Sequence, residues 1–277
     1  PVAREGEVMR LMEADAALPG TANSEYGIRS LAISADGLRV LALESLDSGS
    51  RLRWTTDRGE ALAPALEQEV PYQVPAAALS PLGDRIAVAA LDGTVRVWNV
   101  ESGKTQWVAS YTGQPITGLA FEAGGRLLAD GNALGAVRVN RIADGRPVLA
   151  YANREPTAIR QMAFSADRRY IATLATDGRV ELWNIESGVA AAAPPDPFGQ
   201  GFTALASAVD GSGIWLADRR GSVRLWDPAT QGWLTSQPTL LRPGVAVVNS
   251  LAADPSGVHL AAGWSDGLSS VDPAQMP

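Results

Sequence analysis

Three carboxylates recur at matching points of the chain, and each directly precedes a glycine. They are Asp92, Asp177 and Asp266. If they converge on one face, they could bind a calcium ion or act as an acid–base pair, because both tasks use neighbouring carboxylates. Asp-Gly is also the pair that a type I′ hairpin turn favours, since both central residues need a positive φ. Turn formation explains the aspartates better, so we predict no metal site and no cofactor.

The other reactive side chains exclude several classes of enzyme. The 277 residues include no cysteine, which excludes disulfides, thiolate metal sites and a cysteine nucleophile. The one histidine, His259, excludes a multi-histidine metal site. It shares a repeat position with Arg39, Arg85 and Tyr170, which indicates a solvent-facing side chain. A catalytic base also needs a placed nucleophile and an orienting group, and none is evident. We therefore expect no catalytic residues and no enzyme.

Tryptophans mark a repeating unit. The chain has eight, and four of them end similar alternating segments: Trp54, Trp98, Trp183 and Trp226. The other four fall outside this pattern: Trp107, Trp215, Trp233 and Trp264. Exposed tryptophan and arginine often anchor interfaces, so the exceptions are candidates for partner contacts. The alternative is that they fill gaps in the core.

The repeat has a period of about 43 residues, as a column of alanines shows. The alanines stand at positions 32, 78, 120, 163, 206 and 252, spaced by 46, 42, 43, 43 and 46 residues. Asn140 and Asp272 occupy the tryptophan position in two units. The units contain an apolar run such as residues 85–89 and a segment that alternates apolar and polar residues, such as 94–98, and three of the units place an Asp-Gly turn between the two. This pattern predicts short antiparallel strands and an all-β fold.

Four short strands per unit, with Asp-Gly before a strand that ends in Trp-Asp or Trp-Asn, resemble the WD-repeat β-propeller family. The matching pairs are Trp98-Asn99, Trp183-Asn184 and Trp226-Asp227. The resemblance implies four-stranded antiparallel blades around a central channel, used as a binding platform. The family's Gly-His dipeptide is absent, which implies an incomplete hydrogen-bond network in every blade. Leu134 and Arg220 also replace the turn aspartate in two units.

The period sets the expected domain organisation. We predict a single propeller over 1–277, as part of a larger protein, with units near 26–70, 73–113, 115–153, 158–200 and 201–245. A closing blade would combine 247–277 with outer strands from 5–20, because an open sheet edge invites aggregation. That makes six blades, five complete and one composite. A seven-bladed ring is the alternative.

Charge and hydropathy limit the classes of partner that the chain can bind. Lys and Arg total 23 and Asp and Glu total 30, a net charge of −7, which argues against nucleic-acid binding. No segment is long and apolar enough to cross a membrane, and no signal peptide is evident, which favours the cytoplasm. We expect a scaffold or sensor module of a bacterial multidomain protein that binds a protein, a peptide or other domains of its parent.

The expected partner face carries the Asp-Gly turns and the loops that lead into the first strands. Its candidate residues are Arg219, Arg220, Trp264, Asp92, Asp177 and Asp266. Two alternatives remain: a propeller-based hydrolase that uses the face carboxylates, and a purely structural assembly domain.

Overall fold

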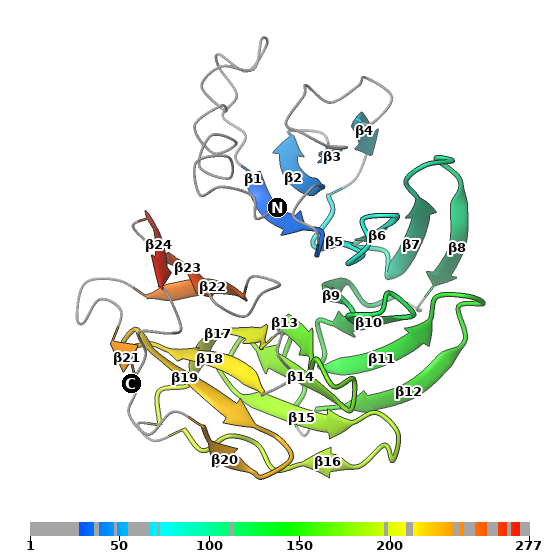
Figure 1. Ribbon diagram of the computed structural model, residues 1–277. Coiled ribbons are helices and arrows are strands. Elements are labelled where there is room, and N and C mark those ends of the chain that lie inside the picture. Colours follow the sequence, from blue (N-terminus) through cyan, green and yellow to red (C-terminus); the bar gives the residue numbers. More distant parts are fainter. Residues whose placement is uncertain are drawn as a thin grey trace.

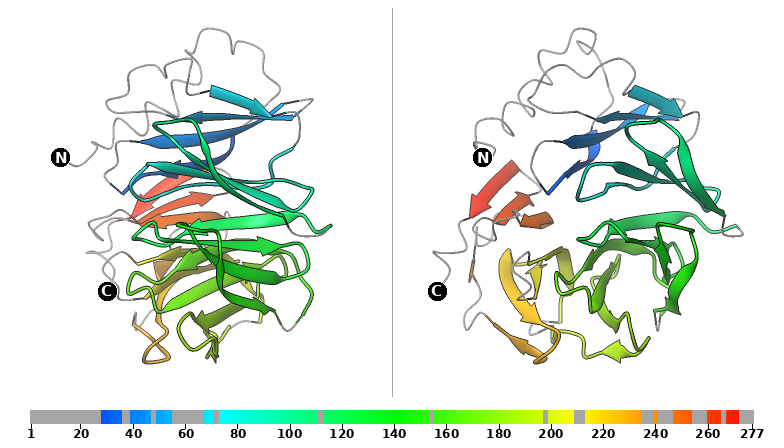
Figure 2. Two further views of the ribbon diagram at one scale, coloured as in Figure 1. Left: turned by 90° about the vertical axis from the view of Figure 1, so that its right-hand side faces the viewer. Right: turned by 45° about the vertical axis from the view of Figure 1, so that its right-hand side comes forward.

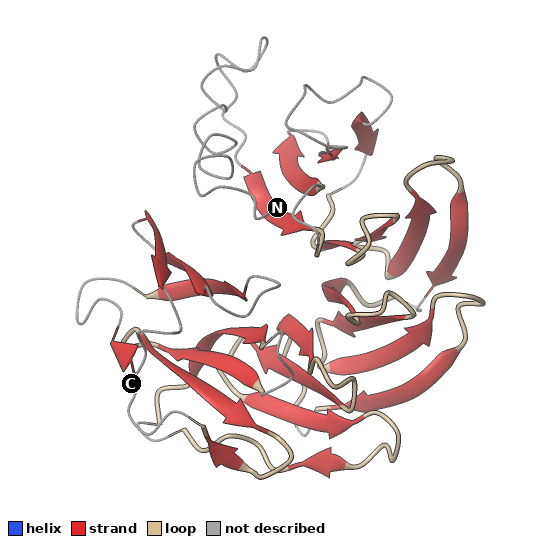
Figure 3. Ribbon diagram, in the orientation of Figure 1, coloured by secondary structure: helices blue, strands red, loops and turns tan. Residues whose placement is uncertain are grey.

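The computed structural model places the chain in antiparallel sheets (Figures 1 and 3). It describes residues 28–35, 39–46, 49–54, 67–70, 73–110, 113–153, 155–196, 199–208, 213–234, 239–240, 247–253, 260–264 and 267–271. These residues form six sheets, here called blades 1 to 6 in chain order. Consecutive strands are neighbours within each blade, so the predicted all-β class is confirmed.

Each blade is a run of consecutive strands. Blade 1 holds β1 (Ile28–Ile33), β2 (Val40–Leu46), β3 (Gly49–Trp54) and β4 (Glu67–Val70). Blade 2 holds β5 (Ala77–Leu79), β6 (Arg85–Ala89), β7 (Thr94–Asn99) and β8 (Thr105–Ser110). Blade 3 holds β9 (Ile116–Phe121), β10 (Leu127–Asn132), β11 (Ala136–Arg141) and β12 (Pro147–Ala152).

The remaining blades have shorter outer strands. Blade 4 holds β13 (Ile159–Phe164), β14 (Tyr170–Ala175), β15 (Val180–Asn184) and β16 (Ala190–Ala191). Blade 5 holds β17 (Phe202–Ser207), β18 (Ile214–Asp218), β19 (Ser222–Asp227), β20 (Gly232–Trp233) and β21 (Thr239–Leu240), which also pairs with β19. Blade 6 holds β22 (Val248–Ala253), β23 (Leu260–Trp264) and β24 (Gly267–Val271).

The blades follow one another around a common centre (Figure 2). In Figure 1 the first strand of each blade lies toward the centre, and the fourth strands of blades 1 to 5 lie at the outside. A blade in this arrangement is covered on both faces by its neighbours. Its second strand is therefore a continuous buried apolar run, as in β6 and β14. The third strand β7 alternates buried and half-buried residues along most of its length, as its sequence predicts.

Apolar side chains hold consecutive blades together. Five buried clusters are present in the described residues, and each joins one pair of neighbours, from blades 1 and 2 through to blades 5 and 6. The junction of blades 4 and 5, for example, buries Leu174 against Leu216, both at most 1% exposed. Burial of this kind is the main favourable contribution to folding.

A β-bulge recurs at the second residue of the first strand. The pairing of the first and second strands skips one residue in blades 1, 3, 4, 5 and 6: Arg29, Thr117, Arg160, Thr203 and Asn249. A bulge leaves its extra residue outside the regular ladder and redirects the side chain. Thr117 uses this freedom to donate its hydroxyl to the carbonyl of Ile159 in the next blade, at 2.6 Å.

Blade 6 takes its third strand from the C-terminal part of the chain. β24 pairs with β23 and forms the third strand of the blade expected over 247–277. Gln161 of blade 4 ties this end of the ring to its neighbours: it accepts from the Leu205 amide at 3.0 Å and donates to the Asn249 carbonyl at 3.3 Å. Residues 5–20, expected to add outer strands, lie outside the described residues, so the composite blade stays a prediction.

Candidate binding face

One face of the ring collects the turns that the sequence singled out. Ile159 at the start of β13 lies opposite Ala175 at the end of β14, and Phe202 lies opposite Asp218 in the same way. The turns between second and third strands therefore share a face with the loops that lead into the first strands. We call this the hairpin face, and the other side the opposite face.

Asp92 and Asp177 both serve their own turns. Asp92 Oδ1 accepts from the Thr94 amide at 2.9 Å and from the Thr94 hydroxyl at 2.7 Å, and these bonds hold the pKa of Asp92 below its usual value. Asp177 Oδ1 accepts from the Arg179 amide at 3.0 Å. The two residues belong to blades 2 and 4, with blade 3 between them. Asp266 lies outside the described residues.

These contacts favour the structural interpretation of the aspartates. The part of the chain that the structure describes contains no group of three or more His, Cys, Asp or Glu side chains placed to hold a metal ion. The geometry therefore supplies no clustered carboxylates for the chemistry considered from the sequence. Each carboxylate instead stabilises a hairpin by accepting a backbone N–H, which is the usual role of aspartate in a turn.

The two blades without the turn aspartate use a different acceptor. Asn132 Oδ1 accepts from the amides of Leu134 and Ala136, each at 2.9 Å. Asp218 Oδ1 accepts from the amides of Arg220 and Ser222, at 2.8 and 3.0 Å. Sequence reasoning missed both acceptors. The available signal was a polar residue at the end of the second strand in the two units that lack Asp-Gly.

Moving the acceptor changes what the hairpin tips present. In blades 3 and 5 the residues at the tips no longer supply a side-chain acceptor to the turn. Leu134 is 49% exposed, and Arg219 and Arg220 are both exposed. Leu91, at the neighbouring tip of blade 2, is 51% exposed. The structure therefore places Arg219 and Arg220 on the hairpin face, as the sequence predicts, and adds two leucines.

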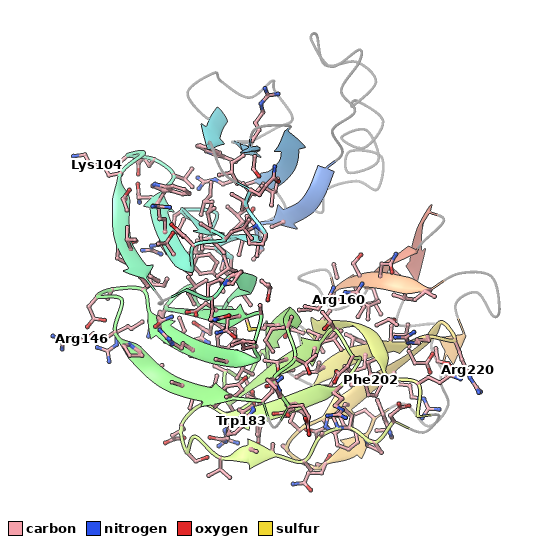
Figure 4. The ribbon with its side chains drawn as sticks, turned by 180° about the vertical axis from the view of Figure 1, so that it is seen from behind. Lys104, Arg146, Arg160, Trp183, Phe202 and Arg220 are labelled. Atoms are coloured by element: carbon pink, nitrogen blue, oxygen red, sulfur yellow. The ribbon has the colours of Figure 1, made fainter. Side chains whose placement is uncertain are left out.

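Arg160 is a further residue of this face. It is the bulge residue of β13, its side chain is exposed, and it donates to the Asn249 carbonyl at 3.4 Å. In Figure 4, Arg160 lies toward the centre of the ring and Arg220 lies at the right edge. The sequence pattern did not identify Arg160, because a bulge position cannot be distinguished from a regular strand position without the pairing register.

The repeat tryptophans lie within the blades. Trp226 is 3% exposed, and Trp54, Trp98 and Trp183 are half-buried. The indole N–H groups of Trp54, Trp183 and Trp226 are buried without a hydrogen-bond partner in the described residues. A buried donor without a partner weakens a fold. These unpartnered indoles agree with the incomplete hydrogen-bond network that the missing Gly-His dipeptide implies.

Three of the four exceptional tryptophans also pack inside the molecule. Trp215 is 7% exposed in the core of blades 5 and 6, and Trp107 packs between blades 2 and 3. Trp233 contacts Trp226 edge-to-face, with ring centroids 5.1 Å apart. The alternative that such tryptophans fill gaps in the core is favoured for these three, because each packs between strands or blades. The side chain of Trp264 lies outside the described residues, so its place on the partner face stays a prediction.

The described residues contain no helix that is long and apolar enough to span a membrane.

Known proteins share both the repeat and the architecture. The family model described as "WD domain, G-beta repeat" matches residues 71–99 and 148–184. The WD repeat-containing protein 91 homolog of Dictyostelium discoideum is 30% identical over 115 residues, which are 40% of this chain and 15% of that protein. Telomerase protein component 1 of Rattus norvegicus is 29% identical over 201 residues, which are 71% of this chain and 7% of that protein.

The chain thus spans 15% and 7% of the length of these two relatives. Both come from eukaryotes and lend no support to a bacterial origin. The β-propeller domain of Cps50 (Swd1) from Myceliophteria thermophila superimposes with a TM-score of 0.70 at 12% identity, over 89% of this chain and 83% of that one. The family model thus identifies WD repeats in residues 71–99 and 148–184, and the structural match shows that the chain has a β-propeller fold.

Proposed function

We propose that this domain is a non-catalytic module that binds a protein or peptide on its hairpin face. The relocation of the turn acceptor to Asn132 and Asp218 carries the proposal. It leaves the side chains of Leu134, Arg219 and Arg220 exposed at the tips, while Leu134 and Arg220 contribute their backbone amides to the bonds that close the turns. Leucine and arginine in such positions give a surface both apolar contact and hydrogen-bond donors.

The opposite face offers a contrast that supports the same proposal. Its turns are engaged in contacts between blades: the Ala35 amide donates to the Pro81 carbonyl at 2.7 Å, and Arg39 donates to the Gly83 carbonyl at 2.8 Å. Arg168 likewise pairs with the buried carboxylate of Glu122 at 2.7 Å. These turn residues are less available to a partner, whereas Leu134, Arg219 and Arg220 have exposed side chains at the tips of the hairpin face.

Because the chain contains no cysteine, a single engineered cysteine can be labelled selectively, and this allows a direct test. Peptides would be selected from a random display library on the purified chain, and their binding measured after a bulky maleimide is attached at one engineered cysteine. Leu134→Cys carries the bulky group on the hairpin face, and Glu101→Cys carries it on the opposite face. We expect the group at position 134 to abolish peptide binding and the group at 101 to leave it intact. Equal effects at the two positions, or no peptide enriched over background, would overturn the proposal.

A further inference from the structure

The hairpin face of blades 4 and 5 carries two arginines without a carboxylate partner in the described residues. Arg160 and Arg219 are exposed, and neither pairs with a carboxylate of the described residues. Within the described residues, a hydrogen bond from the guanidinium to the Asn249 carbonyl holds the Arg160 side chain in place. A guanidinium has five N–H donors, so each of these side chains keeps donors for a ligand.

The carboxylates of the same region are occupied by the main chain. Asp196 accepts from the Gly201 amide at 2.7 Å, and the buried Asp218 accepts from two amides of its own turn. Asp177 accepts from the Arg179 amide and pairs with the Arg179 side chain at 3.5 Å. The oxygens of these carboxylates are thus hydrogen-bonded within the fold.

The exposed residues of the sector carry more positive than negative charge. On the hairpin face of blades 4 and 5, the exposed charged residues are Arg160, Arg179, Arg219 and Arg220 against Asp177 and the loop residue Glu155. The whole chain has a net charge of −7. At physiological ionic strength, charges more than about 8 Å apart are largely screened, so a ligand at this surface responds to the local arginines.

We propose that this sector binds an acidic peptide segment that carries an apolar residue. The inference rests on the proposed function and specifies the chemistry of its ligand. Arginine pairs with carboxylates through two parallel N–H···O bonds, which orients an acidic chain as well as attracting it. Leu134, at the hairpin tip of blade 3, supplies an exposed apolar contact on the same face. A nucleic acid fits less well, because its long backbone would extend past these few arginines onto the surface of a chain whose net charge is −7.

The test compares two variants with the same change in charge. One replaces Arg160, Arg219 and Arg220 by glutamine on the hairpin face. The matched control replaces three exposed cations in turns of the opposite face by glutamine: Lys104, Arg126 and Arg146. Figure 4 shows Lys104 and Arg146 at the left edge, and Arg220 at the right edge. The probe is a fluorescent glutamate-rich peptide with a central leucine, and its anisotropy is measured with the full chain at two salt concentrations.

We expect the hairpin-face variant to bind the acidic peptide about tenfold more weakly, and the control variant to bind like the parent chain. A glutamine-rich peptide with the same leucine should bind weakly to all three proteins. Equal losses in the two variants would overturn the inference, because they would indicate general electrostatic attraction. Tighter, arginine-dependent binding of a single-stranded oligonucleotide would also overturn it.

The outcome separates this inference from the proposed function. If library peptides are blocked at position 134 but acidic peptides fail to bind, the acidic specificity is wrong and the binding role stands. If the bulky group has equal effects at positions 134 and 101, the binding role itself is wrong. Thermal unfolding of each glutamine variant confirms that the fold is retained, which is expected because all six side chains are exposed.

Discussion

Asn132 and Asp218 show how a single side chain can move within a turn without loss of its bond. In blades 2 and 4 the acceptor lies in the turn, at Asp92 and Asp177. In blades 3 and 5 it lies at the end of the second strand and accepts from two amides. A carboxylate or amide oxygen in either position satisfies backbone donors that the hairpin ladder leaves unpaired.

This equivalence can be tested by moving the acceptor back. Asn132→Ala should lower the free energy of unfolding by about 1–2 kcal/mol, because the amides of Leu134 and Ala136 lose their partner. Adding Leu134→Asp creates an Asp-Gly pair with Gly135, like Asp92-Gly93, and should restore most of the loss. Urea unfolding of the single and double variants measures both changes.

The control is Leu134→Asp alone, which we expect to change stability little while Asn132 is present. The idea fails if the double variant is no more stable than Asn132→Ala, since the two acceptor positions would then not be interchangeable. The folded double variant would present aspartate instead of leucine at the hairpin tip. The exchange of acceptors therefore also changes the hairpin face, on which Leu134 is exposed.

At the scale of the element, blades 4 and 5 meet through a close approach of two glycine backbones. Gly178, in the turn after β14, and Gly201, before β17, have φ of +88° and +77°. A Cβ on Gly201 would lie 2.9 Å from the Gly178 Cα and 3.1 Å from the Asp177 carbonyl oxygen. The Phe202 amide donates to the Gly178 carbonyl at 2.7 Å, which fixes this approach.

Gly201→Ala should therefore destabilise the protein by at least about 2 kcal/mol, from steric overlap added to the cost of a positive φ. Gly199→Ala is the matched control in the same loop. Gly199 has a φ of +64° and no atom within 4 Å of a built Cβ, so only the conformational cost of about 1 kcal/mol applies. Thermal unfolding compares the two, and equal effects would contradict a steric role for the glycine contact.

The elements were largely predictable because their signals are local. An Asp-Gly pair and an alternating strand depend on neighbours in the chain, so β7 and the turn at Asp92 follow from a short window of sequence. Arg160 and the Arg168–Glu122 ion pair depend on the pairing register and on the next blade, which no local window contains. Trp107 and Trp233 show the same limit, because the volume a tryptophan fills is set by another strand.

At the scale of the whole molecule, the junctions between blades do not close a ring within the described residues. Six blades arranged in a closed ring need as many junctions as blades. The described residues contain five apolar clusters, and none of them joins blade 6 to blade 1. Within the same residues, blade 6 has three strands, with β24 at its outer edge. An unpaired edge readily pairs with another chain, so closure is a requirement of solubility as much as of stability.

We predict that residues 5–20 protect this edge, in line with the composite blade expected from the repeat. Deleting residues 1–20 should then speed amide hydrogen exchange in β22, β23 and β24, since these strands would lose their outer neighbour. Exchange in β9–β12 of blade 3 serves as the internal reference and should not change. Unchanged exchange throughout blade 6 would rule out this closure and favour the seven-bladed alternative, in which strands from elsewhere complete the ring. The deletion should also affect the binding surface, because the Asn249 carbonyl of β22 holds Arg160 in place. If blade 6 loosens, the same deletion variant should bind the acidic peptide more weakly when its anisotropy is measured.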